Sequence, residues 1–415
     1  MNLRLARYID RWVGLAICFV LWLGARLQGA LTGRAIVPPL LATTPADPAD
    51  AARPPRRLLA IKFYGLGNIA MILPTLQALG RGGDGCEIDF LTLPGNVALL
   101  RQSGLVRETL TVEVGSFAAF VRSAVHLFTT LRTGRYDAVV DFEQFMKLSG
   151  ILAFVTGAAA RVGFNTEGQA RGWLYTHRIA YADTDHMADI FMRTALPFGR
   201  AVLPAPRVRL EVDPAERLQV LAKLAVAASE PVVAMHVGTG PNYDKIALKR
   251  WDVERFAALA DDLVVRRGVR IVFTGQGAEE SALVDEAINA MRERARAVSA
   301  CDRLSVRELV ALLDAATFVV SNDTSVMHLT GLVGTPVVAF FGPTEPRIYG
   351  PRGDDDLVFY KSLFCSPCLS NYNLKMSRCV NPVCMRAITV EEVLRGVAAR
   401  FPETASPAAP RAASL

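Results

Sequence analysis

The chain has 415 residues, of which 51% are hydrophobic and 21% are charged, and its formal net charge is +6. This length and composition predict two globular domains with sizeable cores and exclude a disordered chain. The basic residues are scattered, so we expect no nucleic-acid partner, whereas a mild positive charge suits an anionic membrane surface or a phosphate-bearing substrate.

The N-terminal segment carries an uninterrupted apolar run, Trp12–Ala25, with arginines on both sides of it. A spanning helix needs about 20 apolar residues, so this run is short. Three interpretations follow, in order of preference: a helix lying in the interface of an anionic leaflet, a short spanning helix, and a cleaved signal peptide. We predict a membrane-associating helix over residues 1–37, followed by a linker over 38–57 that is rich in Pro, Ala and Asp.

A first α/β domain is predicted over residues 58–202. The run RLLAIKFY reads as a buried strand, and a tight turn containing Gly65 and Gly67 leads into a helix over 69–79. Glycines between a strand and a helix let the backbone approach a ligand closely. Taken alone the signal is weak, because the turn lacks the third glycine of a dinucleotide fingerprint.

A second polar site in this domain follows the predicted strand YDAVVDF, which ends at Asp141 and is followed by Glu143. Ligands of doubly wound sheets bind at the carboxyl ends of the strands, so these two carboxylates lie where chemistry is expected. The other interpretation is that they cap the helix predicted over 148–156. Arg171 and His177 come later, in a polar stretch, and either contact an acidic acceptor or are solvated.

The second domain is predicted over 215–402, after a proline-rich connector at 203–214. A buried strand over 231–237 leads into a loop with Gly238 and Gly240, and Lys249 and Arg250 follow. A lysine here can reach a diphosphate as a point charge. After the next strand, Glu279 or Glu280 binds ribose hydroxyls or stabilises the N-terminus of its helix.

Residues 318–351 read as strand, loop, helix, strand and loop. The residues over 322–325 are all types that cap a helix start. Free N–H groups and the positive end of the helix dipole make such a turn a seat for a diphosphate. We therefore predict that the diphosphate-binding residues include Asp323, Thr324, Ser325 and His328.

Four cysteines follow with the spacing C-x2-C-x10-C-x4-C: Cys365, Cys368, Cys379 and Cys384. Four clustered thiols suggest a structural zinc site, and the alternative is that the thiols are reduced or redox-paired. The remaining three cysteines are isolated and read as buried small hydrophobes. A closing helix over 388–400 precedes a tail at 403–415 whose Ala/Pro-rich composition predicts disorder.

The string SNDTSVMHLTGLVGTPVVAFFGPTEPRIYGP resembles the nucleotide-sugar-binding signature of glycosyltransferase family 9, the heptosyltransferase family. The stretches IKFYGLGNIAMILPTLQAL, YDAVVDF, RVGF and KRW resemble further family motifs in the family's order. The resemblance covers residues 58–395. Two positions depart from it, because Ser325 stands where the family usually has Gly, and Asn68 stands where it has Asp.

The resemblance implies the GT-B architecture, in which two Rossmann-like domains face a cleft, with the donor on the second and the acceptor on the first. It implies transfer of a sugar, heptose from ADP-heptose, to a lipopolysaccharide core or similar glycolipid at the cytoplasmic face of the inner membrane. No catalytic metal is expected. The alternatives are a catalytically silent nucleotide-sugar-binding or scaffold protein, and a sugar-nucleotide epimerase of the same architecture.

The departure at Asn68 bears on the general base, because the resemblance assigns that role to the family's Asp and an amide accepts no proton at neutral pH. We predict that Glu143 takes the proton from the acceptor hydroxyl. Asp141 is expected to hold loop N–H groups, and Asn68 to orient the acceptor.

Overall fold

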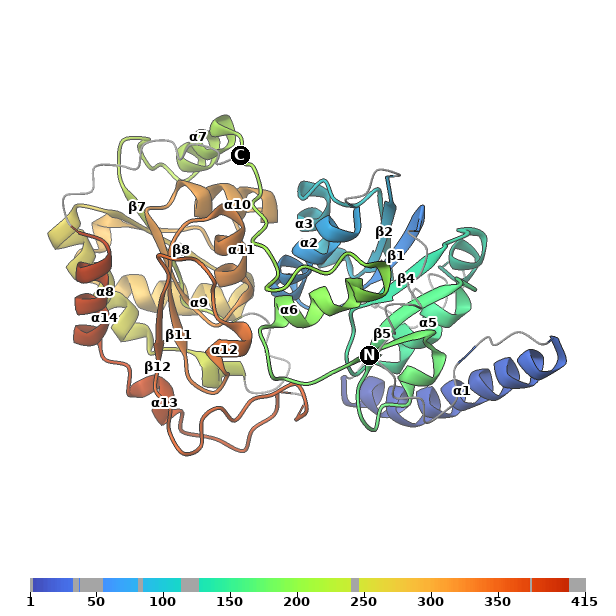
Figure 1. Cartoon of the computed structure of the whole chain (residues 1–415). Helices are drawn as coiled ribbons and strands as arrows, with labels where there is room; N and C mark the ends of the chain where they lie inside the picture. The colour runs from blue at the N-terminus through green and yellow to red at the C-terminus, as the bar shows by residue number, and fades with distance from the viewer. Residues whose placement is uncertain are drawn as a thin grey trace. The chain divides into compact units, whose positions relative to one another are not determined.

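The chain divides into two units, Met1–Pro206 and Arg207–Leu415, and each is built on one parallel sheet (Figure 1). The boundary falls inside the stretch 203–214. In this computed structural model the described residues are 3–32, 37, 55–80, 85–112, 127–239, 246–373 and 375–402. The expected tail at 403–415 and all but the last three residues of the expected linker lie outside them.

The first unit holds a six-stranded sheet in the order β3-β2-β1-β4-β5-β6, and every pairing in it is parallel. Strands β1 and β4 are almost completely buried, because helices cover both faces of such sheets. The strands are β1 Arg57–Ile61, β2 Glu87–Thr92, β3 Glu108–Thr111, β4 Ala138–Asp141, β5 Ala160–Asn165 and β6 His177–Ala180.

Among the described helices of this unit, one begins earlier than predicted. Helix α2 begins at Leu66 and not at residue 69, and Pro74 lies inside it. The bounds are α1 Leu3–Thr32, α2 Leu66–Gly80, α3 Val97–Gln102, α5 Lys147–Val155 and α6 Met187–Met192, with the short 3₁₀ helices η2 Pro94–Asn96, η3 Arg171–Leu174 and η4 Arg193–Phe198.

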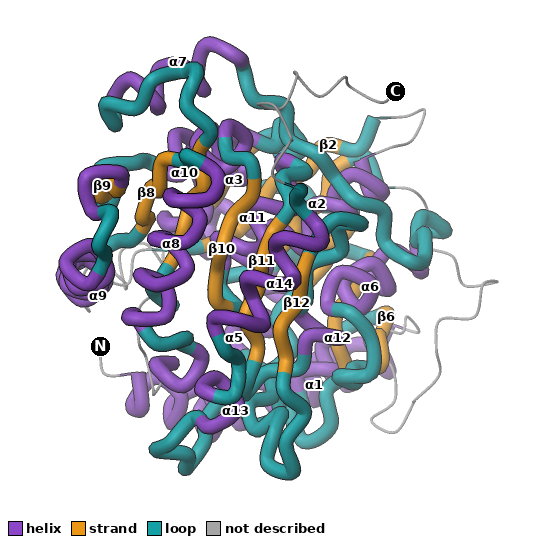
Figure 2. Tube along the Cα trace, turned by 90° about the vertical axis from the view of Figure 1, so that its left-hand side faces the viewer, coloured by secondary structure: helices purple, strands orange, loops and turns teal. Residues whose placement is uncertain are grey.

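The second unit repeats the arrangement with the order β12-β11-β10-β7-β8-β9, again with parallel pairing throughout. Figure 2 shows β10, β11 and β12 side by side behind α14. The strands are β7 Val232–His236, β8 Arg270–Thr274, β9 Ala297–Ser299, β10 Phe318–Asn322, β11 Val337–Phe341 and β12 Leu357–Tyr360.

Helices cover both faces of this sheet, and α8 and α14 bury their apolar sides in one core with Trp251 and Phe256. A capping box between Ser305 and Glu308 starts α10. The bounds are α7 Pro214–Lys223, α8 Val253–Arg267, α9 Gly277–Ala290, α10 Val306–Ala315, α11 Ser325–Val333, α12 Pro346–Tyr349, α13 Val383–Arg386 and α14 Val390–Arg400, with the 3₁₀ helices η5 Ile246–Lys249 and η6 Arg294–Arg296.

Both sheets have the same doubly wound order when each is numbered from its own first strand, 3-2-1-4-5-6. Strand order reverses between β1 and β4 in the first unit and between β7 and β10 in the second. Ligands of such sheets bind outside the carboxyl ends of the strands at this switch point. The fold therefore marks one candidate binding region in each unit.

Helix α1 packs lengthwise on α5 and η3 of the first unit. The side that faces the domain carries Asp10, Gly14 and Cys18, which recur every four residues and so share one face. The opposite side exposes large apolar residues, among them Trp12 and Phe19. The stretch Tyr8–Thr32 is long and apolar enough to cross a membrane by length and composition.

Candidate active site

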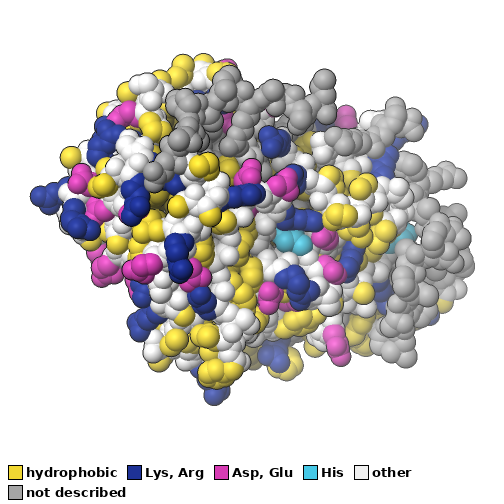
Figure 3. All heavy atoms as spheres, turned by 60° about the vertical axis from the view of Figure 1, so that its left-hand side comes forward, with side chains coloured by type: hydrophobic (Ala, Val, Ile, Leu, Met, Phe, Trp, Pro, Cys, Tyr) yellow, Lys and Arg dark blue, Asp and Glu magenta, His cyan; other side chains and the backbone are white. Residues whose placement is uncertain are grey.

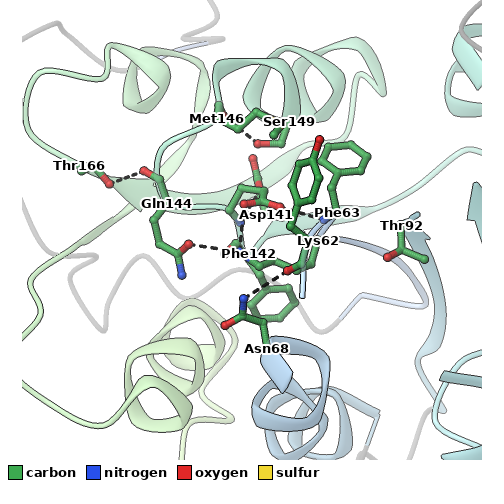
Figure 4. Close-up of polar contacts among 12 residues, drawn as sticks. Lys62, Phe63, Asn68, Thr92, Asp141, Phe142, Gln144, Met146, Ser149 and Thr166 are labelled. Carbon is green, nitrogen blue, oxygen red and sulfur yellow. Dashed lines mark hydrogen bonds and ion pairs between the residues drawn. The ribbon is translucent and has the colours of Figure 1, made fainter. Parts of the chain in front are cut away.

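At the switch point of the first unit, a buried ion pair joins the ends of β1 and β4 (Figure 4). Lys62 Nζ lies 2.9 Å from Glu143 Oε2, and the other carboxylate oxygen accepts the N–H of Phe63 at 2.8 Å. Burial raises the pKa of Glu143, but Lys62 and the Phe63 N–H lower it further than burial raises it. Glu143 is therefore an ionised carboxylate with both oxygens engaged.

Asp141 belongs to a second buried network behind this pair. Its Oδ1 accepts the N–H of Glu143 at 2.9 Å, as expected for a residue that holds loop N–H groups. Its Oδ2 accepts from Arg171 at 2.6 Å and from the Tyr175 hydroxyl at 2.5 Å, and both partners are completely buried. Burial raises the pKa of Asp141, and Arg171 offsets part of that rise. The sequence allowed two interpretations of Arg171, a contact with the acceptor or a solvated side chain. The structure shows instead that Arg171 pairs with Asp141.

Asn68 lies in the first turn of α2, the helix that follows β1 (Figure 4). Its side-chain amide donates to the carbonyl of Tyr64 at 3.2 Å. Gly65 makes this approach possible, since its φ of 92° is left-handed and a Cβ there would collide with the Asn68 amide. Gly67 is buried in the same turn.

Helix α5 is capped by a residue 137 positions away and not by the carboxylates that precede it. Asp10 of α1 accepts the backbone N–H groups of Lys147 at 3.1 Å and Leu148 at 2.9 Å. The interpretation that Asp141 and Glu143 cap this helix is therefore wrong. A carboxylate at a helix N-terminus satisfies N–H groups that have no partner inside the helix.

At the switch point of the second unit, Lys249 and Asp323 form an ion pair. Lys249 Nζ lies 2.6 Å from Asp323 Oδ2, which also accepts from the Thr344 hydroxyl at 2.7 Å. Burial raises the pKa of Asp323, but Lys249 and then Lys375 lower it more, so the net pKa falls to about 2. The three residues come from the β7–α8 loop, the end of β10 and the end of β11. Two of them were predicted, and Thr344 was not.

Trp251 and Asn322 fix the loop that carries Lys249. Asn322 accepts the N–H of Trp251 at 2.9 Å and donates to the carbonyls of Val237 and Gly238 at 3.0 and 3.2 Å. The buried Trp251 ring stacks beside Phe340 and donates from Nε1 to the Ile388 carbonyl. This framework holds the lysine at the end of β10.

The start of α11 differs from the prediction in its capping. Thr324 is the N-cap residue, but it makes no side-chain cap hydrogen bond, and its hydroxyl lies 3.1 Å from that of Ser321. The side chain of Asp323 accepts from Lys249, and that of Asn322 accepts from the backbone N–H of Trp251. The predicted side-chain cap is therefore wrong, and the N-terminal N–H groups of α11 are not capped by the Thr324 side chain. Ser325 and His328 lie in this first turn and are half-buried.

Of the two adjacent glutamates at the start of α9, the structure places Glu280 nearest the strand ends. Glu279 is exposed and pairs with Arg250 at 3.1 Å. Glu280 is buried, accepts the N–H of Gln276, and lies so close to Gly238 that a Cβ there would overlap its carboxylate. The predicted Gly240 lies outside the described residues.

The four clustered cysteines lie beside the loop after β11. The backbone N–H groups of Cys368 and Leu369 both donate to the Pro343 carbonyl, and Cys384 packs against Gly342. Among the described residues, which include all four thiols, no three His, Cys, Asp or Glu side chains are grouped to hold a metal ion. The predicted zinc site is therefore not preformed here.

On the face drawn in Figure 3, basic and acidic side chains are interspersed.

Comparison with known proteins agrees with this geometry. Residues 124–376, more than half of the chain, match the profile described as glycosyltransferase family 9 (heptosyltransferase). The chain is 25% identical over 309 residues to lipooligosaccharide heptosyltransferase 2 of Haemophilus influenzae, covering 72% of this chain and 86% of that one. It is 24% identical to lipopolysaccharide heptosyltransferase 1 of Escherichia coli K12, covering 73% and 92%.

A solved structure shares the fold. The structure of E. coli ADP-heptose lps heptosyltransferase II superimposes with a TM-score of 0.66 at 21% identity, covering 83% of this chain and 98% of that one. Two doubly wound parallel domains, a fold shared with this heptosyltransferase, place the chain in the GT-B fold class. Within that class, the chain belongs to glycosyltransferase family 9, the heptosyltransferases.

Proposed function

We propose that this protein transfers heptose from ADP-heptose to a lipopolysaccharide-core glycolipid. The observation that carries the proposal is the Lys249–Asp323–Thr344 network at the β7/β10 switch point, beside the start of α11, in a chain that belongs to the heptosyltransferase family. The names of its relatives give the donor and the acceptor class. The silent scaffold and the epimerase are not favoured by this membership.

In this proposal the donor diphosphate lies at the N-terminus of α11. Backbone N–H groups at a helix start, together with the positive dipole end, stabilise an anion without any added reorganisation. Lys249 adds a point charge, and Asp323 and Thr344 hold that lysine in place. As heptose leaves ADP, negative charge grows on the β-phosphate, and these fixed donors stabilise it. We propose that no catalytic metal is needed, so transfer should survive exhaustive dialysis against a chelator.

For the acceptor, we propose that Glu143 takes the proton of the attacking hydroxyl. Its lowered pKa keeps it ionised at neutral pH, which is the form a general base must have. Proton transfer at Oε2 requires the acceptor hydroxyl to take the place of Lys62 there. Asn68 then orients the acceptor from the neighbouring turn, as an amide that can both donate and accept.

For the membrane, we propose that α1 lies in the interface of the cytoplasmic leaflet and does not cross it. Its docked stretch, from Asp10 to the contact between Trp22 and Trp173, extends about 18 Å at 1.5 Å per residue. A helix held along its own domain over this length presents only its outer face to lipid. That face carries apolar and aromatic residues, and Arg11 beside Trp12 adds attraction to anionic headgroups.

A flotation assay with vesicles tests this orientation without removing the helix. The double substitution Trp12→Glu and Phe19→Glu should abolish binding to anionic vesicles and leave the domain folded, because both side chains are about half exposed. Matched control substitutions at Phe128 and Leu218, which are exposed on the described part of the domains, should leave binding unchanged. Continued flotation of the α1 variant would contradict the interfacial helix.

The four cysteines remain our proposed position for a structural zinc ion, bound after the thiols move together. Metal analysis of the protein purified without added metal tests this. The proposal expects about one zinc per chain, and its loss in a variant with Cys368 and Cys379 both replaced by Ser. Absence of metal in the unaltered protein would show that the thiols are reduced or paired.

A further inference from the structure

The chain segment that carries Cys365 and Cys368 and ends at Lys375 packs on the loop next to the Asp323 site. We call residues 365–373 and 375 the cysteine arm. Its base is fixed on the loop after β11, because Cys368 and Leu369 both donate to the Pro343 carbonyl, at 2.9 and 2.7 Å. Pro343 directly precedes Thr344, which holds Asp323. The arm is therefore anchored one residue away from the Lys249–Asp323 network.

The arm ends in a lysine with an unusual backbone conformation. Lys375 has a φ of 56°, a backbone conformation that residues other than glycine rarely adopt. Its N–H closes the arm by donating to the Ser370 carbonyl at 2.9 Å. Asn373 tightens the same loop by donating to the Cys368 carbonyl. Such conformations persist where the surroundings fix them, and they concentrate at ligand-binding sites.

The Lys375 ammonium group lies against helix α12. It lies 3.8 Å from the ring centroid of Tyr349, a cation–π contact with a ring that is almost fully buried. From there its charge acts on Asp323, whose pKa it lowers after Lys249 does. Lys375 and Lys249, from different parts of the chain, therefore both favour the ionised form of this carboxylate.

The charges at this site indicate why a second cation matters. A nucleoside diphosphate carries at least two negative charges, and more develops on the leaving phosphate during transfer. Lys249 shares its charge with Asp323 at 2.6 Å, and Arg250 shares its charge with Glu279 at 3.1 Å. Lys375 brings a further positive charge close enough to lower the pKa of Asp323.

We propose that Lys375 is a donor-contacting residue, which the cysteine arm positions against Tyr349 so that its ammonium group binds the diphosphate of the nucleotide sugar. This inference rests on the proposed function, since it assigns a further residue to the same donor site. It gives the cysteine arm a role in the reaction, because any change in the four thiols that moves the arm also moves this cation.

Calorimetric titration of the full-length protein with ADP tests the assignment. Lys375→Met should weaken ADP binding about tenfold or more, the effect of losing one charge-assisted hydrogen bond. Lys375→Arg should retain most of the affinity, because it keeps the charge. Lys361→Met is the matched control, since Lys361 is a half-buried lysine of the same unit that pairs with Glu392 at 2.7 Å. It should bind ADP like the unaltered protein.

A second pair of measurements separates a charge contact from a structural role. The salt dependence of ADP binding should become shallower in Lys375→Met, because one screened cation is lost. Its thermal midpoint without nucleotide should match that of the unaltered protein. Tyr349→Leu should weaken ADP binding by a smaller factor, because it removes only the support of the cation.

The outcomes distinguish this inference from the function on which it rests. Unchanged ADP affinity in Lys375→Met, with normal binding by the unaltered protein, overturns the assignment of Lys375 alone. A weaker affinity that Lys375→Arg fails to recover, together with an unchanged salt dependence, also overturns it. Failure of the unaltered protein to bind ADP, GDP or UDP would contradict the proposed function itself.

Discussion

Asp10 in the N-terminal helix caps helix α5 at Lys147, 137 residues further along the chain. The contact makes α1 part of the first domain, because the same carboxylate also accepts the N–H of Leu148. Helix α5 carries Ser149, which accepts from the buried Arg171 beside Asp141. Helix α1 thus supports the element that lies next to the candidate acceptor site.

Replacing Asp10 by Ala should lower the free energy of unfolding by about 1 kcal/mol, in the range for a lost N-terminal cap. Two backbone N–H groups at the start of α5 would lose their acceptor. Denaturant unfolding measures the change, and Glu167→Gln, at an exposed carboxylate of the same domain, is the control. Equal stability of the Asp10 variant and the control would show that the cap is replaced by water at no cost.

Removing one partner of the buried Lys62–Glu143 pair should be costly, whereas removing both should be mild. Lys62→Met leaves a buried carboxylate uncompensated and should lower the free energy of unfolding by about 3–5 kcal/mol. The double variant Lys62→Met with Glu143→Gln should recover much of this loss. The cycle is measured by denaturant unfolding at pH 7, and additive effects of the two single changes would contradict the pairing.

The same pair predicts a pH dependence with a definite sign. The pKa of Glu143 is lower in the folded protein than its usual value, so the folded state favours the ionised form. Its stabilising contribution is present above the usual glutamate pKa and is lost as the pH falls through the folded value. Unfolding measured from pH 7 downward should show this loss in the unaltered protein. The double variant Lys62→Met with Glu143→Gln should lack the part of this pH-dependent loss of stability that comes from Glu143.

At the donor site, Lys249→Ala should weaken ADP binding by about 1.5–3 kcal/mol, the scale of a hydrogen bond to a charged group. The pKa of Asp323 is about 2, so the ion pair stays intact, and the difference between variant and unaltered protein should stay constant, from pH 5 to pH 8. Lys223→Ala is the control, because Lys223 pairs with Glu308 on the surface. Unchanged ADP affinity in both Lys249→Ala and His328→Ala would place the donor elsewhere.

The general base is tested through Asn68 and Glu143 together. Asn68→Asp should keep or raise the transfer rate, because it restores the carboxylate that the family resemblance implies there. Glu143→Gln should lower turnover by about 100-fold or more without changing ADP affinity, which is the usual size of a general-base contribution. Its activity should be compared with the more stable double variant, so that unfolding does not mimic a lost base. Full activity of Glu143→Gln would refute the assignment.

The two switch points could be predicted from the sequence, because their strands are short β-branched runs followed by glycines and polar residues. Residues 318–351 were predicted to form a strand, a loop, a helix, a strand and a loop, and the structure has β10, α11 and β11 there in that order. Lys249 and Asp323 were predicted as separate donor contacts, and the structure joins them in one ion pair. Local patterns identify strand ends well, since ligand sites follow from sheet topology.

The contacts that could not be predicted are those between segments far apart in the chain. No sequence pattern singles out Asp10 as a helix cap, and Lys62 was predicted only as part of the buried strand RLLAIKFY. Asn322 and Asp323 are residue types that often cap helices, but here their side chains form hydrogen bonds with Trp251 and Lys249 of the β7–α8 loop instead. Only the fold shows which of the two adjacent glutamates, 279 and 280, points at Gly238.

The most direct test of the central claim is a transfer assay with the full-length protein in anionic vesicles that contain a heptose-free lipopolysaccharide-core glycolipid. Product is followed by mass spectrometry with ADP-heptose, GDP-heptose and a UDP-hexose as donors. We predict transfer of heptose from ADP-heptose and its loss in Lys249→Ala. Binding of ADP-heptose without transfer, in both the unaltered protein and Asn68→Asp, would contradict the claim that this chain is a working heptosyltransferase.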